Sequence, residues 1–133
     1  MSCELCDSVG GELLWQSDLC RVVLVEDAHN GGFCRVILNA HVKEMTDLDT
    51  YLRAKLMVTV FAVEAAVRAI VKPDKVNLAS LGNVVPHLHW HVIPRFEDDR
   101  HFPNPIWGEV KREGEKRQIN VEALRQAIKT GLG

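Results

Sequence analysis

Hydrophobic and polar positions follow two different periods along this chain, one typical of strands and one typical of a helix. Short β-branched and aromatic runs, bounded by glycine, proline or polar residues, predict strands. These runs span residues 12–17, 19–26, 33–39, 75–82 and 86–94. The connection between the second and third runs contains two adjacent glycines, which is typical of a loop.

Between the third and fourth strands, apolar residues recur at helical spacing. The pattern predicts one amphipathic helix from about 47 to 72, with Thr46 or Asp47 as its N-cap and Asp49 helping the exposed amides of the first turn. Pro73 disfavours helix in the residue before it, so the helix must end there.

The chain after the fifth strand is polar and punctuated by prolines, which predicts an extended surface segment. Asn120 is then expected to cap a short closing helix, which Gly131 can end. This order of elements predicts an α+β fold, with a five-stranded antiparallel sheet, one long helix and a short C-terminal helix. The length of 133 residues, without repeat or linker, predicts a single domain over residues 1–133.

The charge balance limits the partners that the chain can be expected to bind. A formal net charge of −2 argues against a protein that wraps a nucleic acid polymer with a basic surface. The longest uncharged apolar run, residues 56–63, is too short to cross a membrane. The first residues are acidic and lack an apolar signal segment, so a cytoplasmic location is expected.

The stretch HLHWHVIPR, residues 87–95, carries the most unusual pattern in the sequence. A strand directs alternate side chains to opposite faces, so His87, His89 and His91 are expected on one face and the apolar residues between them in a core. Three roles fit such a row. The histidines could be polar positions on a solvated face, ligands of a zinc ion, or a nucleophile with its proton donors in phosphoryl chemistry.

The residues just before the row favour the last role over a catalytic metal. No carboxylate lies between residue 78 and His87, although a catalytic metal site often has an acid nearby. Asn77 and Asn83 are neutral amides suited to phosphate or ribose oxygens, and the main-chain amides near Gly82 offer similar donors. The pattern therefore predicts a phosphate-bearing ligand.

The segment HLHWHVI, residues 87–93, resembles the signature of the histidine triad (HIT) family of nucleotide hydrolases and transferases. The resemblance includes the following Pro94-Arg95 and the preceding Asn77 and Gly82-Asn83. It extends over about residues 3–95, which are expected to be the core of a HIT-like domain, and leaves a C-terminal loop and helix at 96–133.

The resemblance implies a role for each histidine of the row. His89 is implied to be the nucleophile that takes the nucleotidyl group as a phosphoramidate. His91 is implied to bind the α-phosphate and assist proton transfer, and His87 to support the site. Asn77 and Asn83 occupy the places of amides that contact phosphate or ribose.

Other positions either complete this pattern or depart from it. Glu26 is near the usual place of a ribose-binding residue, and Asp27 is the competing choice. Phe33 stands where the family usually has a further histidine, and Val84 where it often has serine or threonine. The galactose-1-phosphate uridylyltransferase branch replaces the third histidine, so His91 favours a hydrolase.

The resemblance thus implies cleavage of a nucleoside monophosphate from an amine, acyl or phosphate leaving group. A purine nucleotide or nucleoside phosphoramidate is the implied substrate, and the chemistry requires no cofactor. The alternative is a nucleotide-binding or sensing module with little turnover. The family also implies a homodimer, for which the helix surface around Met57, Val60 and Phe61 is the expected contact.

Four cysteines in such a chain are more typical of free thiols than of disulfides. Cys3 and Cys6 form a C-x-x-C pair, but no strand fits before it, so a thioredoxin-like role is disfavoured. Some HIT relatives hold a structural zinc with such a pair, a histidine after the third strand and the first triad histidine. The equivalent residues are Cys3, Cys6, His41 and His87, and the alternative is a reduced pair without metal.

Overall fold

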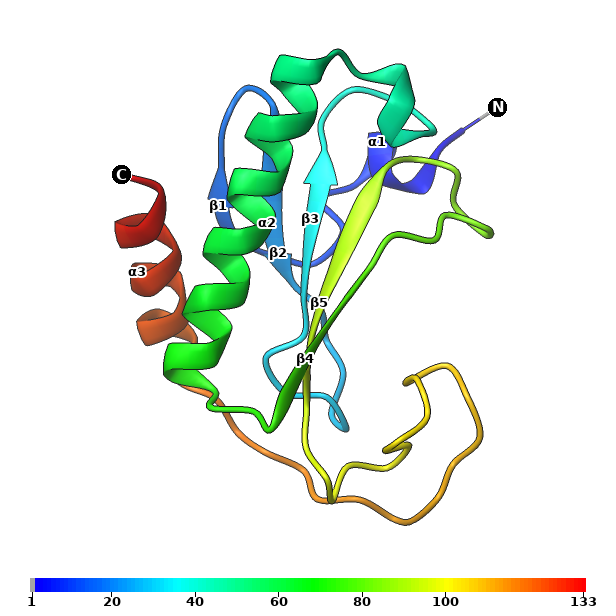
Figure 1. Ribbon diagram of the computed structural model, residues 1–133, viewed down its shortest axis with the longest axis vertical. Coiled ribbons are helices and arrows are strands. Elements are labelled where there is room, and N and C mark those ends of the chain that lie inside the picture. Colours follow the sequence, from blue (N-terminus) through cyan, green and yellow to red (C-terminus); the bar gives the residue numbers. More distant parts are fainter. Residues whose placement is uncertain (1) are drawn as a thin grey trace.

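The computed structural model describes residues 2–133 and shows one five-stranded sheet, in the order β1-β2-β3-β5-β4, with every neighbouring pair antiparallel (Figure 1). The strands are β1 (Glu12–Gln16), β2 (Cys20–Leu24), β3 (Cys34–Leu38), β4 (Lys75–Ala79) and β5 (His89–Arg95), and the helices are α1 (Glu4–Asp7), α2 (Thr50–Ile70) and α3 (Val121–Leu132). The expected α+β class, with its five-stranded sheet, long helix and short closing helix, is confirmed.

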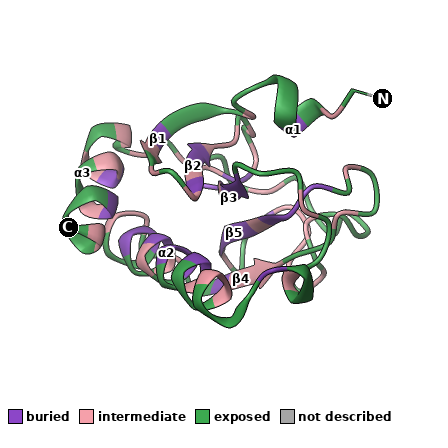
Figure 2. Ribbon diagram, turned by 90° about the horizontal axis from the view of Figure 1, so that it is seen from above, coloured by how far each residue is buried: buried purple, intermediate pink, exposed green. Residues whose placement is uncertain are grey.

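The helices lie on both faces of the sheet. The long α2 and the closing α3 run side by side on one face, and the short α1 lies on the other (Figures 1 and 2). The main core joins α2 and α3 to fully buried strand residues such as Val22, Val36 and Val92. The opposite strand positions Val23 and Ile37 pack against Leu5 of α1. This alternation follows from the two-residue period of a strand.

The predicted start of the long helix was wrong. Asp49 is the N-cap of α2, and its side chain accepts a hydrogen bond of 2.8 Å from the amide of Leu52. Thr46 and Asp47 instead lie in a separate 3-10 turn, in which Asp47 accepts from the amide of Glu44. Each turn has its own acidic cap, so the two do not merge into one helix.

The C-terminal helix starts as predicted but ends later. The Asn120 side chain accepts from the amide of Ala123, which satisfies one of the free donors of the first turn. The helix continues through Gly131 to Leu132, so Gly131 does not end it.

The sequence pattern did not predict α1, whose position depends on Arg21 of β2. This guanidinium donates to the main-chain oxygens of Leu5, Ser8 and Val9, at the C-terminal end of the short helix. A cation at that end also complements the helix dipole. Arg21 thereby fastens the segment that carries Cys3 and Cys6 to the sheet.

The segment after β5 contains no helix or strand until α3, but it is more firmly fastened than an extended surface segment. Arg95, 2% exposed, donates to both carboxylate oxygens of Asp99 and to the main-chain oxygen of Asn104. Asp99 also accepts from the amides of Phe96 and Phe102. These bonds fold the loop back beside β4 and β5 (Figure 1). Among the described helices, none is long and apolar enough to cross a membrane.

Candidate functional site

A pocket of about 370 Å³ lies on the α1 face of the sheet, where β3, β5 and the loop before β5 meet. Its lining comes from four separate parts of the chain. The lining residues are Glu4, Leu5, Arg35, Leu81, Gly82, Asn83, Val84, Val85, His89, His91 and Trp107. Two of the three histidines therefore share one pocket. The predicted strand began at residue 86 and included His87, but β5 begins at His89, so the alternation holds only for His89 and His91.

His89 is the first residue of β5, and its ring has a defined orientation. Its Nδ1 lies 2.5 Å from the main-chain oxygen of His87. A carbonyl oxygen only accepts, so Nδ1 must carry the proton, and Nε2 keeps its lone pair. Burial lowers the pKa of His89, and the nearby Arg35 lowers it further. A ring in this state has the free Nε2 lone pair that a nucleophile requires.

His91 has the complementary arrangement. It lies opposite Arg35 in the β3–β5 pairing, and the Arg35 Nε donates to its Nδ1 at 3.5 Å. With Nδ1 as the acceptor, the proton of a neutral ring is on Nε2. Burial, with the neighbouring His89 and Arg35, lowers the pKa of His91 to about 4. His91 is therefore a neutral imidazole near pH 7, with an N–H to donate.

Two aromatic side chains fix the ring of His91. Trp107 lies edge-on to it, with 5.0 Å between the ring centroids, and Phe33 is tilted against it at 5.7 Å. Phe33 is 2% exposed, so it packs beside His91 and offers no polar group there. The Arg35 guanidinium also lies over the Phe33 ring, 5.6 Å from its centroid.

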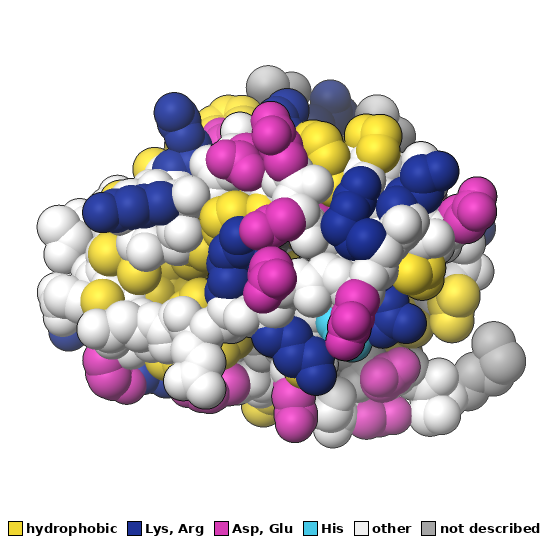
Figure 3. Space-filling model, turned by 90° about the horizontal axis from the view of Figure 1, so that it is seen from below, with side chains coloured by type: hydrophobic (Ala, Val, Ile, Leu, Met, Phe, Trp, Pro, Cys, Tyr) yellow, Lys and Arg dark blue, Asp and Glu magenta, His cyan; other side chains and the backbone are white. Residues whose placement is uncertain are grey.

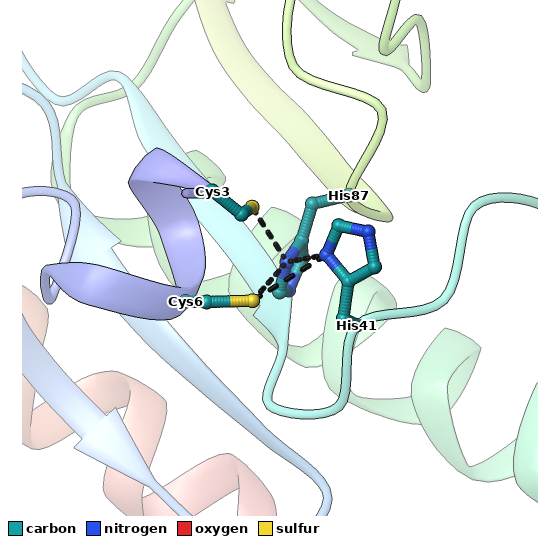
Figure 4. A group of neighbouring side chains, drawn as sticks. All are labelled: Cys3, Cys6, His41 and His87. Carbon is teal, nitrogen blue, oxygen red and sulfur yellow. Dashed lines mark hydrogen bonds between the residues drawn. The ribbon is translucent and has the colours of Figure 1, made fainter. Parts of the chain in front are cut away.

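His87 does not line this pocket but belongs to a neighbouring cluster with Cys3, Cys6 and His41 (Figure 4). The ligand atoms of these four residues all lie within 4.8 Å of one another. The His87 Nδ1 is 3.4 Å from the Cys3 sulfur, 3.5 Å from the Cys6 sulfur and 3.3 Å from the His41 Nδ1. Cys6 lies in α1 and Cys3 is its N-cap, while His41 lies in the segment after β3 and His87 in the segment before β5.

The donor set of this cluster fits a zinc ion. The His87 Nε2 lies 2.6 Å from the main-chain oxygen of Leu38 and must donate to it, which leaves the Nδ1 lone pair directed at the two sulfurs and His41. Histidine ligands of metals commonly have their second nitrogen fixed in this way. Two thiolates and two imidazoles form a closed set that is typical of structural zinc.

The three predicted nucleotide-binding residues do not come together. Asn83 lines the pocket with His89 and His91. Asn77 lines a different cavity, on the β4 side, and its Oδ1 accepts a 2.8 Å hydrogen bond from Arg95. Glu26 is exposed, beyond the end of β2, and is not among the lining residues. The competing Asp27 closes its own turn by accepting from His29 and Asn30.

The sequence patterns missed Arg35, Glu4 and Trp107 as lining residues. For Arg35 the sequence did offer a signal, because it is the only charged residue in the otherwise apolar strand FCRVIL. The two-residue period of a strand places it on the same face as Ile37. Glu4 and Trp107 offered no comparable signal, since their positions depend on how α1 and the loop after β5 fold back.

The HIT domain profile matches residues 9–98. A histidine triad protein of Bradyrhizobium japonicum is 30% identical, with 88% of this chain and 91% of that chain covered and a TM-score of 0.74. A histidine triad protein of Sinorhizobium meliloti is 27% identical, with coverage of 99% and 94% and a TM-score of 0.73. A search of curated proteins gave no match.

A zinc-bound histidine triad family protein of Mycobacterium smegmatis shares the fold, at 19% identity, with coverage of 99% and 94% and a TM-score of 0.65. Together with the profile match, these likenesses define the class of protein. The chain belongs to the HIT family, as the pattern around His89 indicated.

Proposed function

We propose that this protein is a nucleotidyl hydrolase in which His89 is the nucleophile and His91 a hydrogen-bond donor to the phosphate and the leaving group. The observation that carries the proposal is the complementary state of the two rings in one pocket. His89 is fixed with a lone pair on Nε2, and His91 with a proton on Nε2. The HIT family includes hydrolases and transferases, which supports a nucleotide substrate.

In the first step, the His89 Nε2 forms a bond to the α-phosphorus of a nucleotide, and the bond from phosphorus to the leaving group breaks. The leaving group departs with the bonding electrons and takes a proton from solvent water, while the Nε2–H of the neutral His91 ring donates a hydrogen bond to it. Water then attacks the phosphorus of the nucleotidyl-histidine, the bond from phosphorus to the His89 Nε2 breaks, and the proton that the water loses passes to solvent. The nucleoside monophosphate is released and His89 is restored. We propose that Asn83, another lining residue, hydrogen-bonds phosphate or ribose.

The proposed substrates are purine nucleotides with an amine, acyl or phosphate leaving group, and nucleoside phosphoramidates foremost. The test is a panel of adenosine phosphoramidates and dinucleoside polyphosphates, combined with mass spectrometry of the protein quenched during turnover. A nucleotidyl adduct on His89 is expected.

A second candidate is nucleotide sensing with little turnover, which the apolar Phe33 beside His91 favours. Nucleotide binding without product or adduct would select that candidate.

We further propose that Cys3, Cys6, His41 and His87 hold a structural zinc ion. When bound, the ion would cross-link α1 to the segments around β3 and β5. The same His87 that supplies a ligand accepts, through its main-chain oxygen, the bond that orients His89. No step of the proposed reaction requires the metal.

We also propose a homodimer formed through the outer face of α2. Tyr51, Val58 and Phe61 are 69%, 59% and 53% exposed, and they repeat at helical spacing on that face. Val60 is fully buried within the chain, so the expectation that it takes part in the contact was wrong.

We propose a small-molecule ligand rather than a nucleic acid polymer, on the basis of the formal net charge of −2. On the face shown in Figure 3, basic and acidic side chains are mixed.

A further inference from the structure

Arg35 occupies a central strand, where a charged side chain is costly unless it has a purpose. Its neighbours along β3, Cys34 and Val36, are fully buried, and its own side chain is partly buried against Phe33 and His91. An arginine stays charged at any pH of interest, so its partial burial requires an anionic or polar partner.

The structure provides little to neutralise that charge. Within residues 2–133, no carboxylate makes an ion pair with Arg35, and the single recorded hydrogen bond of its side chain goes to a neutral imidazole. Glu4 is the one carboxylate among the described lining residues, and it acts on Arg35 through its charge without direct contact. Part of the guanidinium fork is therefore free to bind a ligand in the pocket.

The rest of the lining supplies no other fixed positive charge. It consists of apolar side chains, the Asn83 amide, Glu4 and the two histidines. A nucleotide brings at least one negative charge at the reacting phosphorus, and charge increases there in the transition state. A preorganised guanidinium is suited to such an oxyanion, because its planar fork can contact two oxygens at once.

We propose that Arg35 is the phosphate-binding residue of this pocket, and that it holds the non-bridging oxygens of the α-phosphate beside His89 and His91. This inference rests on the proposed function, since it names the group that receives the charge of the transferred phosphate. Glu4, on the α1 wall, opposes Arg35 and weakens the binding of anions. The pocket thus has one fixed charge of each sign, which favours ligands with a single charge at the reacting centre over polyphosphate chains.

The experiment measures the binding of adenosine monophosphate, adenosine and inorganic phosphate by calorimetry at pH 7. Arg35→Met is expected to weaken the binding of adenosine monophosphate and of phosphate about tenfold to a hundredfold, which is the range of a charge-assisted hydrogen bond. The affinity for adenosine should not change. Arg35→Lys is expected to recover part of the loss, and Glu4→Gln to bind phosphate more tightly than the wild type. Arg68→Met is the matched control, because it removes the same charge from an exposed position of α2.

The outcomes separate this inference from the proposed function. If the wild type binds adenosine monophosphate and Arg35→Met binds it equally well, the role of Arg35 is wrong while the function stands. If Arg35→Met binds adenosine more weakly by the same factor, the pocket has collapsed, and the role of Arg35 in phosphate binding is also rejected. If phosphate binding depends on Arg35 but the wild type does not distinguish adenosine monophosphate from phosphate, the inference stands and the nucleotide function falls. A wild type that binds neither anion overturns both.

Discussion

The Nδ1 of His89 donates a hydrogen bond of 2.5 Å to the main-chain oxygen of His87. The ring of His87 itself faces Cys3 and Cys6. Two histidines of one motif thus belong to two sites. His87 belongs to the Cys/His cluster, and His89 lines the pocket with its Nε2 lone pair free. Because the contact is made by the main chain of His87, a change at its side chain and a change at His89 should have separable effects.

Replacing His89 by asparagine is expected to abolish turnover, with a loss of about a thousandfold or more, since the amide cannot form the nucleotidyl intermediate. The variant should keep the wild-type unfolding midpoint and its affinity for adenosine monophosphate, because the Arg35 guanidinium remains. Steady-state hydrolysis of an adenosine phosphoramidate measures the first effect, and calorimetry the second. Retention of more than a tenth of the activity would reject the assignment of His89 as nucleophile.

Protein purified without chelator is expected to contain about one zinc ion per chain by metal analysis. Cys3→Ser should lose the metal and lower the free energy of unfolding by about 3 kcal/mol or more, because a tightly bound ion stabilises only the folded state. Cys34→Ala is the matched control for zinc content, since this buried thiol lies outside the cluster and burial raises its pKa to about 12. Zinc well below one per chain, with Cys3→Ser as stable as the wild type, would show that the cluster is an empty thiol pair.

The free energy of unfolding of the protein is expected to depend on the buried ion pair of Arg95 and Asp99, which holds the loop after β5 in place. Asp99→Asn should cost about 3–5 kcal/mol, because it leaves Arg95 buried without its counter-charge. The exposed pair of Arg117 and Asp98 provides the control, and Asp98→Asn should cost about 1 kcal/mol or less. Urea unfolding of the two variants measures both values, and equal costs would contradict the importance of the buried pair.

Most of the sheet and part of the site could be predicted from the sequence because strand periodicity is local. The two-residue period places His89 and His91 together, and it holds for Arg35 as well. Asn77 was expected at the nucleotide, but Arg95 binds its side chain. That contact joins diagonal neighbours of the β4–β5 pairing. Arg95 in turn donates to Asp99 and Asn104, which lie in the folded-back segment whose sequence shows no periodicity.

The outer face of α2 shows another limit of such patterns. The helix is apolar around much of its circumference, so spacing alone could not separate Val60, which packs on the sheet, from Val58, which faces outward. Asp49 was likewise recognised near the start of the helix but not as its cap, because Thr46 and Asp47 are equally good capping residues.

The proposed dimer predicts a change in mass when the outer face of α2 is made polar. Phe61→Glu is expected to yield a monomer at micromolar concentration in light scattering, because an exposed charge at the centre of an apolar contact is costly to bury. Glu64→Gln, a little further along α2, should leave the mass unchanged and serves as the control. A wild type that is monomeric in the same measurement would reject the dimer.

The low pKa of His91 predicts a loss of stability in weak acid. Its folded value of about 4 is below the ordinary value of 6.5, mainly because the ring is buried and also because it faces His89 and Arg35. As the pH falls below 6.5, the unfolded chain takes up a proton that the folded chain refuses, so the free energy of unfolding decreases until about pH 4 and then levels off. The full effect is about 3 kcal/mol.

Urea unfolding of the wild type and of His91→Gln, at pH 7 and pH 4.5 with chelator present, measures this effect. The free energy of unfolding should decrease less in the variant than in the wild type, by about that amount. Equal losses in the two proteins would mean that His91 takes up its proton in the folded state as readily as in the unfolded chain.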